Sequence, residues 1–376
     1  MVPSFGNREA EIAAARLKVP VSIAEVDSAG IVQIQPKTGC TLIDGVVEET
    51  RAFPDDTALF LHTSGTTGLP KGVPLSHRNM VTTMKNIVAT YKLTSSDRGY
   101  VVMPLFHVHG LMAALFGAIY STGSIVLPAK SAGFQANAFW GHIATYKCTW
   151  YTAVPTMHQS LLAVPEHYEA AGRPSLRFIR SCSSSLPPPV LWKLEEVFKA
   201  PVIEAYAMTE ACHQMTSNPL PEDGPHKAGS VGLPFNVELK ILDNNANELP
   251  AGEVGEVVVR GNNITKGYHN RPDANAEAFL SDGFFRTGDL GYRDADGYVF
   301  LTGRIKEQIN RGGEKIAPVA IDNILLDCPG IAALFAFGVP HEQLAPSLVP
   351  LVLRPYLPAV LSRRACCRRL HGLQTR

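Results

Sequence analysis

Short apolar strands alternate with helices through the middle of the chain, and this alternation constrains the fold more than any other feature. The strands are predicted at residues 99–103, 124–127, 149–155, 176–179 and 202–205. Helical patterns lie between them, and one of these begins at residues 187–189, three prolines that a first helical turn tolerates. A helix between consecutive strands permits parallel pairing. We therefore expect an α/β fold with a parallel sheet flanked by helices.

Polar side chains follow three of these strands, at the point where each strand ends. They are His107 and His109, then Ser181 and Ser183, and then Thr209, Glu210 and His213. Because ligands bind beyond the carboxyl ends of the strands in open α/β sheets, we expect these side chains to lie near a ligand. Two other interpretations of the first two histidines stay open: core histidines with satisfied hydrogen bonds, or two ligands of a metal site. A His-x-His pair is weak evidence for a metal, and no convincing third ligand is evident.

A loop rich in Gly, Ser and Thr at residues 63–71 follows an apolar run that we expect to be a buried strand, residues 57–61. A short extended link then leads to Ser76, which is placed to cap a helix. Glycines let backbone N–H groups point into one concavity, and Lys71 adds a positive charge, so the loop suits a polyphosphate. It is not the P-loop of GTPases, because Pro70 stands where that pattern needs Gly. A flexible surface turn is the less favoured alternative.

The regions outside the alternating core differ from it in pattern. Residues 1–50 hold a short helical pattern and an alternating run, and they look like the tail of a subdomain. Alternating β patterns and a hairpin turn at Asp296–Gly297 predict an antiparallel subdomain over residues 229–303, which completes a large domain of residues 1–303. Residues 304–339 would begin a small C-terminal domain, with a helix at 318–326. Residues 340–376 form a tail that we place on no packed element.

Composition indicates a globular protein with ample core, since 45% of its 376 residues are hydrophobic and 18% are charged. Lys plus Arg and Asp plus Glu both number 34, so the charge gives no indication of a nucleic-acid partner. The longest apolar run, residues 111–120, is far short of the roughly 20 residues that a membrane span needs. Seven cysteines without a disulfide-like spacing suggest reduced thiols. With no secretory signal evident, we expect a cytoplasmic protein.

Three stretches together resemble the adenylate-forming, or AMP-binding, acyl-CoA synthetase family. They are residues 63–71, residues 206–210, and residues 287–289 with 303–306, and the resemblance runs from about residue 54 to 339. Within the family, residues 104–110 and 204–219 are most similar to the oxalate–CoA ligases. The resemblance implies an ATP-dependent carboxylate–CoA ligase that forms an acyl-adenylate and then a thioester. Its expected cofactors are ATP, Mg²⁺ and coenzyme A.

The resemblance also implies roles for individual residues. The phosphate-binding residues of the family correspond to Thr63, Ser64, Gly65, Thr66, Thr67, Gly68 and Lys71, which would hold the β- and γ-phosphates. The other expected contacts are Thr209 with the α-phosphate, Glu210 with Mg²⁺, Asp289 with the ribose hydroxyls, Arg304 in support of Asp289, and Tyr206 near the adenine. A single Glu suffices for Mg²⁺, which keeps most of its waters. Lys306 falls at the family's hinge, about which the small domain rotates.

The region expected to bind the acid is polar. It contains His107, His109, Ser181, Ser183 and His213, and we group His107 with Thr209 and Glu210 as catalytic residues. A pocket for a fatty or aromatic acid should have apolar walls, so these donors favour a small dicarboxylate. The choice of oxalate rests on the resemblance. Cys212 stands where relatives carry a small residue, and we assign it no role.

The chain also departs from the family pattern. The upstream part of the large domain is missing, and no segment after residue 339 resembles the one that supplies the family's adenylating lysine. The alternative hypothesis is therefore a catalytically impaired, nucleotide-binding fragment. A third hypothesis, another adenylation chemistry such as amino-acid activation or a luciferase, is disfavoured by the polar pocket. Some relatives carry a C-terminal peroxisomal signal, whereas this chain ends Leu373 to Arg376 without one. The oligomeric state is left open.

Overall fold

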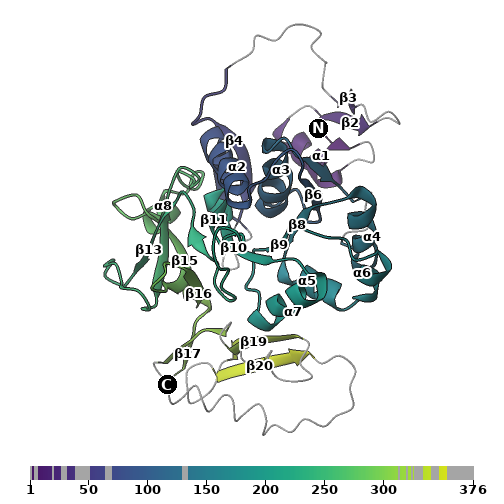
Figure 1. Cartoon of the computed structure of the whole chain (residues 1–376). Helices are drawn as coiled ribbons and strands as arrows, with labels where there is room; N and C mark the ends of the chain where they lie inside the picture. Colours follow the sequence, from purple (N-terminus) through teal and green to yellow (C-terminus); the bar gives the residue numbers. More distant parts are fainter. Residues whose placement is uncertain are drawn as a thin grey trace. The chain divides into compact units, whose positions relative to one another are not determined.

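A computed structural model defines two compact units, Met1–Ala52 and Phe53–Arg376. The structure describes residues 2–3, 7–18, 21–26, 32–38, 51–63, 70–128, 134–311, 314–318, 321–322, 325, 333–339 and 347–353 (Figure 1). In the part of the chain that it describes, no helix is long and apolar enough to cross a membrane.

The first unit is a small three-stranded sheet with one helix. Its elements are β1 (Val2–Pro3), α1 (Arg8–Leu17), β2 (Val21–Val26) and β3 (Val32–Thr38). Strand β2 pairs in parallel with β1 and antiparallel with β3. The side chain of Asn7 caps α1 by accepting a 3.0 Å hydrogen bond from the Ala10 N–H. The predicted helix is thus confirmed, and the alternating run that follows lies partly in β3.

A seven-stranded sheet forms the centre of the second unit. Its strands are β6 (Arg98–Val101), β7 (Ser124–Val126), β8 (Trp150–Ala153), β9 (Phe178–Ser181), β10 (Val202–Met208), β11 (His213–Ser217) and β12 (Leu233–Pro234). They lie in the order β12-β11-β10-β9-β8-β6-β7. From β7 to β10 all pairs are parallel, and β11 and β12 continue antiparallel. The predicted parallel sheet is confirmed.

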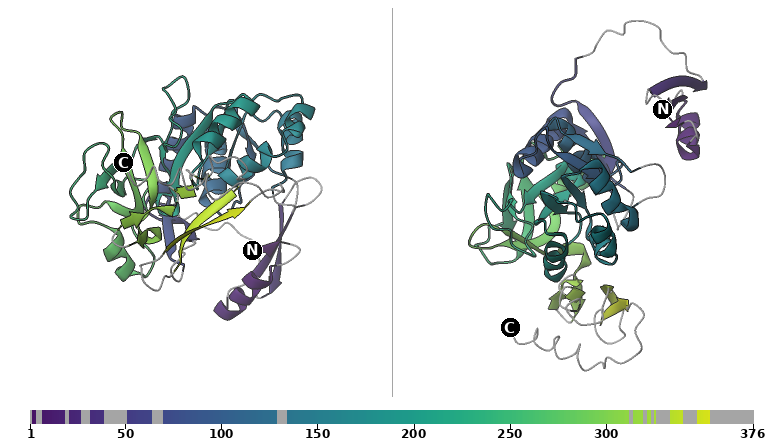
Figure 2. Two further views of the ribbon diagram at one scale, coloured as in Figure 1. Left: turned by 90° about the horizontal axis from the view of Figure 1, so that it is seen from below. Right: turned by 45° about the vertical axis from the view of Figure 1, so that its right-hand side comes forward.

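Helices cover both faces of this sheet (Figures 1 and 2). One face carries α2 (His77–Tyr91), the π-helix η1 (His109–Phe116) and α3 (Gly117–Tyr120), and the other carries α4 (Ala136–Tyr146), α5 (Pro155–Leu162), α6 (Glu166–Ala170) and α7 (Pro188–Phe198). Successive strand residues serve opposite faces: Trp150 packs with α2, whereas Tyr151 packs with α4 and α7. Burial on both faces explains why the parallel strands are largely apolar.

A second sheet is antiparallel throughout. It consists of β13 (Glu238–Leu242), β14 (Gly255–Arg260), β15 (Phe285–Arg293) and β16 (Val299–Arg304), and α8 (Pro272–Ala278) precedes β15. The predicted antiparallel runs and the hairpin between β15 and β16 are confirmed. One apolar cluster joins Val257 and Phe285 of this sheet to Tyr206 of β10 and to Val108 and Ala211, which follow β6 and β10 of the seven-stranded sheet. The ends of both sheets therefore meet.

Strands β4 (Thr57–His62) and β5 (Gly72–Ser76) form a two-stranded hairpin, and the loop that we predicted to bind phosphate is its tip. The expectation of a buried strand here was wrong, because β4 is largely exposed; Phe60 is 43% exposed. The reason is that β4 pairs only with β5 in the described structure. The predicted cap is confirmed: Ser76 and Asn79 form a capping box at the start of α2.

The C-terminal elements are short. They are η3 (Ile305–Glu307), β17 (Ile309–Arg311), β18 (Glu314–Ile316), β19 (Ala333–Val339) and β20 (Ser347–Leu353). Strands β17 and β18 pair antiparallel, as do β19 and β20. The helix predicted at residues 318–326 lies mostly outside the described residues, although those described within it are helical. Strand β20 falls in the tail that the sequence interpretation placed on no element.

Candidate active site

Glu210 lies in the short helix η2 (Thr209–Ala211) directly after β10, and two residues that are distant in sequence surround it. Its side chain is buried, and its Oε1 accepts a 2.7 Å hydrogen bond from the phenol of Tyr268. The Nζ of Lys71 lies 4.4 Å from the centre of the Tyr268 ring, within cation–π range. Glu210 and Lys71, which sequence analysis assigned to the metal and the phosphates, therefore both contact one tyrosine.

Two hydrogen bonds between Thr63 and Lys71 close the base of the predicted phosphate loop, which we call its neck. The Thr63 N–H donates to the Lys71 carbonyl at 3.0 Å, and the Lys71 N–H donates to the Thr63 hydroxyl at 3.3 Å. The residues at the tip, Ser64, Gly65, Thr66, Thr67 and Gly68, lie outside the described residues. The neck brings the ends of the loop to Tyr268, because the neighbouring His269 N–H donates to the Gly72 carbonyl at 2.9 Å.

Asp289 lies in β15, directly opposite Arg304 in β16. Its Oδ2 accepts a short hydrogen bond from the phenol of Tyr206, and its Oδ1 lies 2.9 Å from Nε of Arg304. Burial raises the pKa of Asp289, and the Arg304 charge opposes that rise; burial and the nearby carboxylate raise the pKa of Tyr206 well above its usual range. A carboxylate oxygen has two lone pairs, so each oxygen keeps one with which to accept a sugar hydroxyl.

The other predicted nucleotide-site residues lie close in sequence to these groups. Thr209 is half-buried and begins η2, one residue before Glu210. Lys306 is exposed in η3, two residues after Arg304. The structure therefore connects Glu210, the chain neighbour of Thr209, to Lys71 through Tyr268, and it joins Asp289, Arg304 and Tyr206 through direct contacts.

The residues predicted to bind the acid follow β6, β9 and β10 and form a separate polar cluster. His109 is fully buried; its Nδ1 lies 3.0 Å from the Ser183 hydroxyl, and its Nε2 lies 2.6 Å from the Thr152 hydroxyl. The rings of His109 and His213 meet edge to face, with centres 5.3 Å apart. Burial, together with the charge of Arg180, lowers the pKa of both histidines well below the usual range, so both rings are neutral at pH 7.

Several polar atoms in this cluster have no partner. Both ring nitrogens of the fully buried His213 and the hydroxyl of Ser181 form no hydrogen bond within the described part of the chain. Such groups are costly to bury unless a ligand or water satisfies them. The backbone is also strained here, with positive φ angles at Ser183 (74°), Cys212 (51°) and His213 (116°). Strain of this kind is typical of residues that are held in place for function.

His107 lies at the edge of the same cluster. Its side chain is exposed, and its Nδ1 accepts a 3.1 Å hydrogen bond from the backbone N–H of His109. The contact with a backbone N–H fixes the ring, with Nδ1 as the acceptor, and leaves Nε2 to face a ligand or solvent.

Sequence reasoning missed Tyr268, Thr152 and Arg180. Tyr268 stands in a loop without hydrophobic periodicity, and its contact with Glu210 joins residues 58 positions apart. Thr152 and Arg180 occupy strands β8 and β9, where they are directly opposite each other. Arg180 could have been identified from the sequence, because it is a charged residue within the short, buried strand β9.

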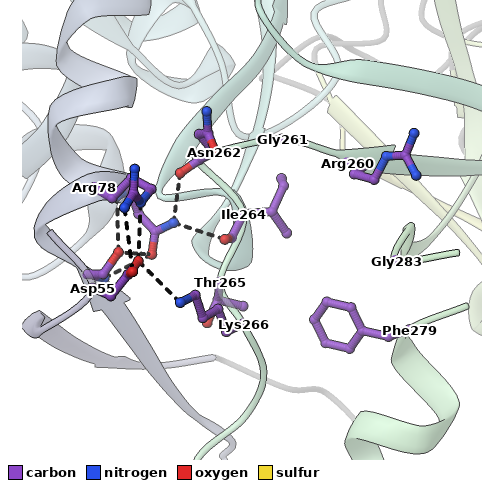
Figure 3. Close-up of a pocket in the computed structure, with 12 residues that line it drawn as sticks. Asp55, Arg78, Arg260, Gly261, Asn262, Ile264, Thr265, Lys266, Phe279 and Gly283 are labelled. Atoms are coloured by element: carbon purple, nitrogen blue, oxygen red, sulfur yellow. Dashed lines mark hydrogen bonds and ion pairs between the residues drawn. The ribbon is translucent and has the colours of Figure 1, made fainter. Parts of the chain in front are cut away.

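A recess of about 300 Å³ is lined by other residues (Figure 3). Its lining includes Asp55, Arg78, Asn79, Arg260, Thr265 and Lys266. The Asp55 carboxylate pairs with both Arg78 and Lys266 at 3.1 Å, and Asn79 donates to the Asn262 and Ile264 carbonyls. Because its charged side chains are already engaged in ion pairs and none of the predicted site residues lines it, we place the candidate active site at the strand ends.

The donor set near Glu210 fits a magnesium ion that is also held by phosphate. In the described residues, no group of three or more His, Cys, Asp or Glu side chains is arranged to hold a metal. Mg²⁺ in nucleotide sites takes only one or two carboxylates, together with phosphates and water. Oε1 of Glu210 is engaged by Tyr268, whereas Oε2 has no hydrogen bond to described residues and is available to such an ion.

Comparisons with known proteins agree with this arrangement. A family model described as "AMP-binding enzyme" matches residues 6–269. The chain is similar to an oxalate–CoA ligase of Arabidopsis thaliana (50% identity, 90% of this chain and 65% of the relative) and to one of Saccharomyces cerevisiae (54% identity, 78% and 53%). The structure resembles ATP-bound MatB from Rhodopseudomonas palustris, with a TM-score of 0.84, 29% identity, and coverage of 99% of this chain and 72% of MatB. The chain thus spans less than two thirds of the length of the curated relatives.

Proposed function

Because the chain belongs to the AMP-binding enzyme family, we propose that it is an ATP-dependent carboxylate–CoA ligase that acts on oxalate or another small dicarboxylate. The observation that carries the substrate class is the polar cluster formed by the buried His109 and His213 and the exposed Ser183. A second carboxylate could accept a hydrogen bond from the one ring N–H of the neutral His213, whereas an aliphatic chain would leave that donor without a partner. The oxalate–CoA ligases among the similar proteins support the same class.

The first half-reaction joins the acid to AMP. A carboxylate oxygen of the acid attacks the α-phosphorus of ATP, the bond to the bridging oxygen breaks, and pyrophosphate leaves. Both reactants are anions, so the site must neutralise charge and align them. The Thr63–Lys71 loop would hold the β- and γ-phosphates, Thr209 would contact the α-phosphate, and Glu210 would bind Mg²⁺, which neutralises phosphate charge. Asp289 and Tyr206 would position the ribose and the adenine.

The second half-reaction forms the thioester. The thiolate of coenzyme A attacks the acyl carbon of the adenylate, and AMP leaves with the oxygen that joined it to the acyl group. We place Lys306 at the hinge for the change between the two steps, with Arg304 still supporting Asp289. In this account residues 1–303 form the large domain, residues 304–339 begin the small one, and residues 340–376 follow as a tail of no assigned role.

A cytoplasmic location is part of the same proposal. Cys148, Cys182 and Cys212 are all buried free thiols, which agrees with a reducing compartment. The proposed partners are the small carboxylate and coenzyme A.

The test is acid-dependent release of pyrophosphate from ATP in the presence of Mg²⁺. We expect release with oxalate, less with malonate, and little with acetate or a medium-chain fatty acid. The variant Ser183→Ala should lower kcat/KM for oxalate about tenfold through loss of a hydrogen bond to a charged group. The control is Ser160→Ala. The Ser160 hydroxyl donates to the Thr156 carbonyl within α5, so its removal should leave kcat/KM for oxalate unchanged. ATP binding without turnover of any acid would instead support the binding-only alternative.

A further inference from the structure

Arg180 is a fully buried arginine without a carboxylate partner. In the described part of the chain, no Asp or Glu oxygen lies within ion-pair distance of its guanidinium, which instead contacts neutral groups. Its Nε donates to the Tyr91 hydroxyl at 2.7 Å, and its Nη1 donates to the Thr152 hydroxyl at 3.1 Å. A guanidinium carries donors and no acceptor, so the direction of both hydrogen bonds is fixed.

The direction of the Arg180–Thr152 hydrogen bond determines the direction of the hydrogen bond between Thr152 and His109. The Thr152 oxygen accepts from Arg180, and its one other described partner is Nε2 of His109, 2.6 Å away. If Nε2 carried the imidazole proton, the Thr152 hydroxyl hydrogen would be buried without an acceptor. That arrangement carries the full penalty of an unsatisfied buried donor. Thr152 therefore donates to Nε2.

The tautomer of His109 also sets the direction of its hydrogen bond with Ser183, at the rim of the cluster. A neutral imidazole has one N–H, so an unprotonated Nε2 places the proton on Nδ1. Nδ1–H then donates to the Ser183 oxygen, 3.0 Å away. The Ser183 hydroxyl hydrogen is left free to point away from His109. Ser183 is exposed and has a left-handed backbone, and its hydroxyl is thus available to a ligand.

We propose that Arg180 is a positioning residue that, through Thr152, holds His109 in the Nδ1–H tautomer and turns the Ser183 hydroxyl hydrogen toward the bound acid. The final link, from Ser183 to the acid, rests on the proposed function; the tautomer does not. The neutrality of His109 supports the chain of donors, since burial and the Arg180 charge lower its pKa. Donors aligned in this way would favour an acid with a second carboxylate over a monocarboxylate.

The direct test is long-range ¹H–¹⁵N spectroscopy of the full chain labelled at histidine, which shows which ring nitrogen carries the proton. His109→Gln identifies the His109 signals. We expect a single Nδ1–H tautomer in the wild-type chain. In both Thr152→Val and Arg180→Met this tautomer should give way to a mixture. The first variant lacks the hydroxyl that donates to Nε2, and in the second that hydroxyl is no longer oriented by Arg180. Arg180→Lys, which keeps a charged donor, should retain it.

The control is Thr216→Val. Thr216 is also a fully buried threonine of this sheet, but its hydroxyl donates to the Val231 carbonyl, so its loss should leave the His109 tautomer unchanged. An Nε2–H tautomer in the wild-type chain would overturn the proposal. So would an unaltered Nδ1–H tautomer in both Thr152→Val and Arg180→Met. If Arg180→Met fails to fold, Thr152→Val, which is nearly isosteric, provides the same test.

Kinetics separates this inference from the proposed function. Thr152→Val should lower kcat/KM for oxalate about tenfold, the effect of a misaligned hydrogen bond to a charged group, and leave KM for ATP unchanged. A wild-type chain with the Nδ1–H tautomer but no pyrophosphate release with any acid would support the tautomer and refute the function. Pyrophosphate release with oxalate from a chain that holds the Nε2–H tautomer would support the function and refute the tautomer.

Discussion

The phenol of Tyr268 donates a 2.7 Å hydrogen bond to Oε1 of Glu210, and this contact fixes the carboxylate that we assign to Mg²⁺. Burial, reinforced by the carboxylate charge, raises the pKa of Tyr268, so the phenol remains a donor at every pH at which the enzyme would work. A carboxylate with one oxygen held by a neutral donor presents its other oxygen in a defined direction. Tyr268 is therefore a positioning residue for the metal ligand.

Replacing Tyr268 with Phe should weaken the use of Mg²⁺. The change removes the hydrogen bond and keeps the ring, so Lys71 keeps its contact. We expect the Mg²⁺ concentration for half-maximal pyrophosphate release to rise about three- to tenfold, the usual effect of one hydrogen bond. Tyr292→Phe is the matched control, because Tyr292 stacks on Phe300 in the antiparallel sheet. An unchanged Mg²⁺ dependence in Tyr268→Phe would refute the role given to Tyr268.

Asp289→Asn should weaken ATP binding. The asparagine retains one acceptor oxygen, which cannot serve Tyr206, Arg304 and two ribose hydroxyls together. We expect KM for ATP to rise about 10- to 100-fold, as for lost hydrogen bonds to a charged group. The control is Asp294→Asn. Asp294 lies in the same hairpin as Asp289 and pairs with Lys227, so its loss should change stability rather than KM. Equal KM values for the two variants would argue against a ribose site at Asp289.

Lys71→Met should distinguish ATP from AMP. If Lys71 contacts the terminal phosphates, its loss should weaken ATP binding about tenfold and leave AMP binding within about twofold, because charge-assisted contacts act at short range. Titration calorimetry with both nucleotides checks this. Lys92→Met, which removes a surface lysine paired with Asp223, should affect neither. Parallel losses of ATP and AMP affinity would show that Lys71 acts elsewhere.

Glu204 should make stability depend on pH. This carboxyl is 4% exposed in β10, and burial raises its pKa to about 8, against the effect of hydrogen bonds from the Gly229 and Leu186 N–H groups. Between about pH 4.5 and 8 the folded chain therefore holds a proton that the unfolded chain has lost. The contribution of Glu204 to the free energy of unfolding falls as pH rises, by about 1.4 kcal/mol per pH unit.

The variant Glu204→Gln isolates this contribution. Gln loses one backbone hydrogen bond, so its stability at pH 5 should be lower, but its decline toward pH 8 should be flatter by about 1.4 kcal/mol per pH unit. Denaturant titrations at several pH values measure both slopes. Glu253→Gln, in an exposed turn before β14, should keep the wild-type slope. Parallel slopes for Glu204→Gln and the wild type would contradict the assignment.

Sequence patterns predicted the frame of the site better than its contacts. The alternation of strands and helices placed His109, Ser183 and Glu210 at one edge of a parallel sheet, because that inference needs only chain order and burial. The strand at residues 57–61 was wrongly expected to be buried, since an apolar run does not reveal how many neighbours a strand has. The Tyr268–Glu210 contact was invisible, because nothing local in either segment depends on it.

The central claim is that the nucleotide residues around Asp289 and Glu210 and the polar cluster around His109 and His213 are two halves of one site. The most direct test is calorimetric titration with a non-hydrolysable oxalyl-adenylate in which a sulfamoyl group replaces the phosphate. We predict binding at one site, at least about 100-fold tighter than AMP, because linked groups bind both halves at once. Asp289→Asn and His213→Ala should each remove that advantage. An affinity equal to that of AMP would contradict the account.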